Sequence, residues 1–136
     1  MPKQAYSLIA RFRQPALRKP AEWVGNSRED LRDLPAESRR ALGFAIHLAQ
    51  IGLHHPAAKQ LKGEFRGLVE VVDDFDGNTY RAVYTVRFAG VVYVLHVFQK
   101  KSTRGIATSR RDLALIRSRL RRAQVHYAAS YVDNER

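Results

Sequence analysis

Residues 68–98, LVEVVDDFDGNTYRAVYTVRFAGVVYVLHVF, contain the pattern that decides the fold. The valine-rich start runs into Asp76-Gly77-Asn78, which is a strong hairpin signal. Residues 79–88 alternate between two faces, as a half-buried strand does. A second turn at Ala89-Gly90 leads into residues 91–98, which are apolar on both faces and suit a central strand covered on both sides. The stretch therefore predicts an antiparallel meander of three strands.

Shorter elements precede this meander. Residues 21–24 suit a short strand that places the only tryptophan against the core. A short helix is expected over residues 28–34, with Ser27 and Asp30 as its N-terminal capping signal. Apolar residues at helical spacing predict a second helix over residues 36–51, which ends before a glycine.

One more helix follows the meander. Ser109 is its expected N-cap, with Asp112 at the matching capping-box position. Its expected buried stripe consists of Leu113, Ile116, Leu120, Ala123 and Tyr127. The element order β-α-α-β-β-β-α predicts an α+β fold, with helices packed on a small antiparallel sheet. We divide the chain into a basic N-terminal arm (1–19), one domain (20–128) and a C-terminal tail (129–136).

Charge is the unusual feature of the composition. The 136 residues carry 24 Lys and Arg against 13 Asp and Glu, a net charge of +11. Such a surplus attracts polyanions, so nucleic acid is the favoured partner, with an anionic membrane surface as the alternative. No apolar run is long enough to span a membrane or to serve as a signal peptide, so we expect a cytoplasmic protein. The absence of cysteine excludes disulfides, thiolate nucleophiles and cysteine-based zinc sites.

Basic residues form the most specific candidate site. The sequence has no metal-binding motif and no phosphate-binding loop, and His54-His55 is interpreted as a solvated pair, so we expect neither metal nor cofactor. Arg81 and Arg87 share one face of their predicted strand, and Lys100 and Lys101 leave the end of the next one. Antiparallel pairing around the second turn places Arg81 roughly opposite Phe98, near Lys100 and within diagonal reach of His96.

Such a cluster suits metal-independent cleavage of RNA by its own 2′-hydroxyl. Arg81 would grip the phosphate, because a guanidinium can bind two oxygens. Lys100 or Lys101 would stabilise charge or accept the 2′-OH proton, and His96 or Tyr127 would supply the proton to the leaving oxygen. The alternative is a plain RNA-binding surface, in which His96 is a hydrogen-bonded core residue. Composition and spacing alone predict a nucleic-acid-binding α+β domain.

Several separate stretches, in the same order, resemble the phage-derived branch of the RelE/HigB toxins. They are Pro20–Ser27, Asp30–Pro35, Ala58–Gly63, Thr79–Tyr84 and Tyr93–Ser102. The resemblance spans about residues 20 to 127, and the element order predicted above matches that fold. The strand motif containing Arg81 and the Phe-x-Lys-Lys motif containing Lys100 and Lys101 carry over from the family.

The resemblance implies the toxin of a type II toxin–antitoxin system, a ribosome-dependent endoribonuclease that cuts mRNA and inhibits translation. It also implies a helix-turn-helix antitoxin as partner. The toxin would be brought to operator DNA only by binding this antitoxin. The histidine–tyrosine pair that some relatives use corresponds only loosely to His126-Tyr127, which leaves the proton donor open. Further RNA-binding positions are expected at Lys59, Lys62, Arg87, Arg104, Arg110 and Arg111. A non-catalytic, nucleic-acid-binding regulator with the same fold is the alternative.

Overall fold

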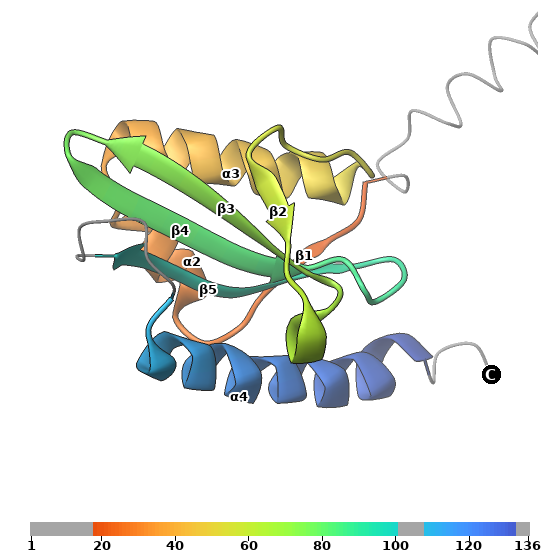
Figure 1. Ribbon diagram of the computed structural model, residues 1–136. Coiled ribbons are helices and arrows are strands. Elements are labelled where there is room, and N and C mark those ends of the chain that lie inside the picture. Colours follow the sequence, from red (N-terminus) through yellow and green to blue (C-terminus); the bar gives the residue numbers. More distant parts are fainter. Residues whose placement is uncertain (1–17, 101–107, 133–136) are drawn as a thin grey trace, which may run out of the picture.

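The computed structural model describes residues 18–100 and 108–132 of the chain (Figure 1). Its strands are β1 (Ala21–Trp23), β2 (Ala58–Gln60), β3 (Leu68–Phe75), β4 (Asn78–Thr85) and β5 (Val92–Lys100). Its helices are α2 (Ser27–Arg32), α3 (Ala36–Gln50) and α4 (Arg110–Tyr127), with short helical turns η2 (Gly63–Phe65) and η3 (Ala128–Val132). Across these residues, no helix combines the length and the apolar character needed to cross a membrane.

The described strands form one mixed sheet in the order β1-β5-β4-β3-β2. The predicted meander β3-β4-β5 is confirmed as its antiparallel centre. Asp76 and Gly77 both have positive φ angles, which the two-residue hairpin between β3 and β4 requires. Two features were not predicted: β1 pairs with β5 in parallel, and β2 adds a strand beyond β3.

Helices cover the two faces of the sheet, α3 on one and α4 on the other (Figure 1). Under α3, Leu42 and Ile46 pack against the valines and tyrosines of the central strands. Under α4, Ile116 and Leu120 pack with Val83 and neighbouring apolar residues. Side chains that alternate along each strand therefore enter two separate cores, which confirms the two-sided burial expected of β5.

The strand predicted over residues 79–88 ends early, at Thr85. The backbone N–H of Arg87 donates to the Thr85 hydroxyl at 3.0 Å instead of to β5, and that hydroxyl donates to the carbonyl of Gly67. Residues 86–91 consequently form a longer connection, not the tight two-residue turn that was predicted. Arg87 lies in this connection, so the prediction that it shares the strand face of Arg81 is wrong.

The two capping predictions had different outcomes. Ser109 caps α4 as expected, accepting a hydrogen bond from the backbone N–H of Asp112 at 3.1 Å. Ser27 does not cap α2, because its hydroxyl is buried and donates to the carbonyl of Val94 at 3.2 Å. A tertiary hydrogen bond to β5 thus replaces the local one that the sequence suggested.

Candidate functional site

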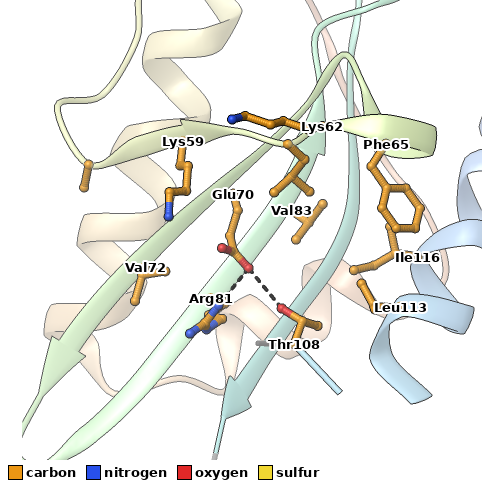
Figure 2. A pocket seen from close by; sticks show the side chains of 12 residues that line it. Lys59, Lys62, Phe65, Glu70, Val72, Arg81, Val83, Thr108, Leu113 and Ile116 are labelled. Carbon is orange, nitrogen blue, oxygen red and sulfur yellow. Dashed lines mark hydrogen bonds and ion pairs between the residues drawn. The ribbon is translucent and has the colours of Figure 1, made fainter. Parts of the chain in front are cut away.

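A groove of about 520 Å³ lies on the α4 side of the sheet, where the helix leaves β3 and β4 uncovered (Figure 2). Leu113 and Ile116 of α4 form one wall, and the segment containing β2 and η2 forms the other. Its polar lining residues are Lys59, Lys62, Glu70, Arg81 and Thr108. The groove therefore combines apolar walls with a small number of charged groups, as binding sites commonly do.

Strand register brings the charged residues together. Lys59 of β2 pairs with Glu70 of β3, so their side chains share the groove face. In the next row of the sheet, Arg81 pairs with Val72 on one side and with Phe98 on the other, which confirms the predicted pairing of Arg81 and Phe98. One row further, Lys100 pairs with Thr79. Period-two alternation puts Arg81 and Lys100 on the same face.

Arg81 is held by a buried carboxylate. Its Nη1 donates to Oε2 of Glu70 at 3.0 Å, and the Thr108 hydroxyl donates to the same oxygen at 3.3 Å (Figure 2). The two ion-paired side chains are 12% and 10% exposed. A guanidinium has five N–H groups, so the pair with Glu70 fixes the position of Arg81 while using only part of its donors.

Lys100 lies at the edge of this cluster. Burial lowers the pKa of its ammonium group, and the neighbouring charge of Arg81 lowers that pKa further, while Glu70 and Asp112 act in the opposite direction. A lowered pKa brings a lysine closer to the range in which it can exchange a proton. Lys101, its predicted partner, lies outside the described residues.

His96 faces α4 and does not line the groove. One ring nitrogen, Nε2, lies 2.8 Å from Oδ1 of Asp112, and the other, Nδ1, lies 3.4 Å from Nη1 of Arg119. Because arginine only donates, Nδ1 accepts a hydrogen bond, and Nε2 carries the hydrogen and donates to Oδ1 of Asp112. Burial lowers the pKa of His96, which favours this neutral form. These contacts match the alternative of a hydrogen-bonded core residue and leave His96 poorly placed as a proton donor.

Tyr127 and Arg87 lie away from the groove. Tyr127 is at the far end of α4, about 20 Å along the helix from Leu113, and its hydroxyl donates to the carbonyl of Ala89. A general acid must come within hydrogen-bond reach of the reacting group, and the structure does not bring Tyr127 together with Arg81. Arg87 donates to the carbonyl of Arg66 at 2.6 Å, beyond the end of β4.

Comparison with known proteins places the chain in a family. The family described as Phage derived protein Gp49-like (DUF891) matches residues 29–121. The chain belongs to the Gp49-like family. This membership confirms the resemblance to the phage-derived branch of RelE-like toxins. None of the curated proteins matches the chain.

Among solved structures, the Gp49-like chain is similar to a chain of the toxin–antitoxin complex RelBE2 from Mycobacterium tuberculosis. The two are 22% identical, with a TM-score of 0.44, and the match covers 61% of this chain and 99% of the other.

The remaining predicted cations of this Gp49-like domain lie in different places. Lys59 and Lys62 line the groove, as an RNA-binding role would require. Arg110 and Arg111 are exposed at the start of α4. Arg104 lies outside the described residues. The groove thus combines Arg81 with two of the additional lysines.

Glu70 is the residue of the Gp49-like groove that the sequence interpretation missed. It stands between Val69 and Val71 in the apolar first half of β3, where an acid is a signal of a buried partner. That signal pointed to a cation across the sheet, and Arg81 on the neighbouring strand supplies it. In the described ranges, no group of three or more histidine, aspartate or glutamate side chains could hold a metal ion.

Proposed function

We propose that this protein is the toxin of a type II toxin–antitoxin system and cuts mRNA on the ribosome, which inhibits translation. The observation that carries the proposal is the placement of Arg81 in a cationic groove with Lys59, Lys62 and the nearby Lys100. Membership of a RelE-like family supports the toxin assignment. The site of action would be cytoplasmic, where ribosomes are.

The groove supports a reaction in which RNA supplies its own nucleophile. The 2′-oxygen attacks the adjacent phosphorus, the bond from phosphorus to the 5′-oxygen breaks, and a 2′,3′-cyclic phosphate and a 5′-hydroxyl result. Arg81 would bind the phosphate oxygens and stabilise the charge that builds up on them. Lys100, whose pKa is lowered, would take part in the proton transfers. Glu70 would position Arg81 through their 3.0 Å ion pair. These residues act without a metal ion in this proposal.

Partners follow from the same proposal. The protein would bind mRNA in the ribosomal decoding site, and a helix-turn-helix antitoxin would neutralise it. The antitoxin would also bind the operator DNA of their shared operon, so the toxin would reach DNA only through it. The exposed Arg110 and Arg111 would contribute phosphate contacts with RNA.

The test is expression without antitoxin. The wild-type chain should arrest growth and leave mRNA cuts at codon positions on ribosomes, with 2′,3′-cyclic phosphate ends. Arg81→Ala should relieve both effects, and Lys100→Ala should reduce them. Arg40→Ala on the exposed surface of α3, which covers the opposite face of the sheet, removes the same charge and should leave both unchanged. Undiminished toxicity of Arg81→Ala would remove the proposed site.

The second candidate function is a non-catalytic RNA-binding regulator. The ion pair with Glu70 favours it, because an internal carboxylate already offsets the charge of Arg81. Under this alternative the protein binds RNA with a steep salt dependence but leaves ribosome-bound mRNA intact. Mapping the 5′ ends of mRNA after expression of the wild-type chain distinguishes the two functions.

A further inference from the structure

A second pocket, of about 250 Å³, lies on the opposite flank of α4 from the groove. It is formed between β1 and the C-terminal half of α4, and Glu22, Trp23, Tyr93, Arg122 and His126 line it. None of these residues lines the Arg81 groove. The pocket therefore holds an independent set of charged and aromatic groups.

Tyr93 fixes the chemical form in which His126 faces the pocket. The Tyr93 hydroxyl lies 2.7 Å from Nδ1 of His126, and Tyr93 is buried. Burial raises the pKa of Tyr93 to about 12, so the hydroxyl keeps its proton and donates it to this nitrogen. With Nδ1 as the acceptor, the imidazole carries its hydrogen on Nε2, and the Ser130 hydroxyl lies 3.5 Å from this nitrogen. His126 thus presents an outward N–H donor.

Arg122 supplies the second donor. It precedes His126 by one helical turn, and residues four apart on a helix lie on the same face. Among the residues that the structure describes, neither Arg122 nor Arg121 has an ion-pair partner. Arg122 and His126 also line an adjoining open depression together with Arg121. The α4 side of the pocket therefore offers a guanidinium and an imidazole N–H with a further cation beside them.

The β1 side of the pocket offers an acceptor instead. Oε2 of Glu22 accepts a hydrogen bond from the Tyr131 hydroxyl at 2.7 Å, and the carboxylate retains further acceptor positions. Trp23 of the same strand also lines the pocket, but its side chain packs with the core under α3, so the recognition rests on Glu22. A bare anion would meet repulsion from Glu22. A ribonucleotide, which has a phosphate at one end and hydroxyl and amino donors at the other, matches both sides.

We propose that this pocket binds one ribonucleotide unit of an RNA strand, with its phosphate on Arg122 and His126 and its ribose 2′-hydroxyl directed to Glu22. The inference rests on the RNA-binding part of the proposed function and does not depend on cleavage. The 2′-hydroxyl is the group by which a protein distinguishes RNA from DNA, so Glu22 gives the pocket a preference for RNA. Tyr93 is a positioning residue that acts through His126.

The test measures binding of single-stranded RNA and of DNA of the same sequence to the full chain by fluorescence anisotropy. Arg81→Ala is included in every variant to prevent cleavage. Adding Arg122→Ala should weaken RNA binding by about tenfold, the effect of losing one charge-assisted contact. His126→Ala should act in the same direction. Glu22→Gln should reduce the ratio of RNA to DNA affinity while the protein still binds both.

Arg40→Ala is the matched control, because it removes one exposed arginine from the other face of the molecule. If Arg122→Ala weakens RNA binding no more than Arg40→Ala does, the inference is overturned, whether or not the wild-type chain cuts mRNA. An unchanged RNA-to-DNA ratio in Glu22→Gln also overturns it. Long-range nitrogen-15 NMR spectra of His126 give an independent readout. In the Arg81→Ala protein, the His126 tautomer with its hydrogen on Nε2 should dominate. Adding Tyr93→Phe should lower the population of this tautomer.

Discussion

At the scale of single residues, the site depends on which side chains meet across the sheet. Arg81 was placed opposite Phe98 from the sequence, and the pairing holds although the connection is longer than predicted, because the register shifts by one residue between Val83 and Tyr84. Glu70 could not be assigned to Arg81 in the same way, because their bond runs diagonally between neighbouring rows of β3 and β4. The separation of Tyr127 from Arg81 could not be derived from the sequence, because it depends on where α4 crosses the sheet.

Glu70→Gln tests the positioning role of that carboxylate. The amide cannot hold Arg81 as an ion pair, so we expect kcat for mRNA cleavage to fall at least tenfold. Removing a negative charge from the groove should leave RNA affinity unchanged or slightly stronger. Steady-state cleavage and RNA binding, measured side by side, separate the two effects. Equal losses in kcat and affinity would contradict a positioning role.

His96 and Asp112 predict how stability responds to pH. Burial lowers the pKa of His96 in the folded state, so the unfolded chain binds the proton more readily. Burial alone would raise the pKa of Asp112, but hydrogen bonds from His96 and Ser109 outweigh it and the pKa is lowered. Both groups therefore contribute stability that is present above their unfolded pKa values and is lost on acidification.

We expect the free energy of unfolding to decrease from pH 7.5 to pH 5.5, where the contribution of His96 dominates because its unfolded pKa is about 6.5. Urea denaturation at the two pH values measures it. His96→Asn should lower stability at pH 7.5 and show a smaller difference between the two pH values. If His96→Asn loses as much stability between pH 7.5 and pH 5.5 as the wild type does, His96 is not the source of the pH dependence.

At the scale of elements, local sequence signals located the helices and the central strands. Tertiary contacts determined the short strands β1 and β2 and the end of β4. β2 is only three residues long and becomes a strand because its register pairs it with β3. The parallel pairing of β1 with β5 joins segments far apart in sequence, which no periodicity reveals. β4 ends at Thr85, where the threonine hydroxyl accepts a hydrogen bond from the backbone N–H of Arg87 and donates to the carbonyl of Gly67.

The contact between α4 and the turn before α2 gives a prediction at this scale. Gly25 has a φ of +61°, and a Cβ placed there would lie 2.7 Å from the guanidinium of Arg119. That guanidinium is buried and held by the Leu95 carbonyl at 2.8 Å, so it has little freedom to move. Gly25→Ala should therefore destabilise the fold by at least about 1–2 kcal/mol, the cost of the left-handed conformation alone.

Gly43→Ala is the matched control within the same chain. Gly43 lies inside α3, and a Cβ there would meet nothing within 4 Å. Alanine should stabilise the helix by about 0.5–1 kcal/mol. Thermal denaturation of the two variants should thus shift Tm in opposite directions. A stable Gly25→Ala variant would show that Arg119 does not pack against the turn as described.

At the scale of the whole molecule, the sheet separates a face covered by α3 from a face on which α4 leaves a groove (Figure 1). The cations that line this groove project from β2, β4 and the segment after β2. The net charge of +11 was evident from composition, whereas its concentration at the groove depended on strand pairing. Nucleic-acid binding could therefore be predicted early, and its location only from the folded chain.

This distribution predicts how RNA binding responds to salt. Each phosphate contact with a single strand contributes about 0.7 to the slope of log affinity against log salt concentration. If Lys59 and Lys62 each contact a phosphate, Lys59→Ala and Lys62→Ala should each lower the steepness by about that amount. Arg40→Ala should leave the slope nearly unchanged, because Arg40 lies on the other face of the molecule and releases no bound counterion from the RNA. Equal slopes in all three variants would mean that RNA is held by the general charge of the protein and not by the groove.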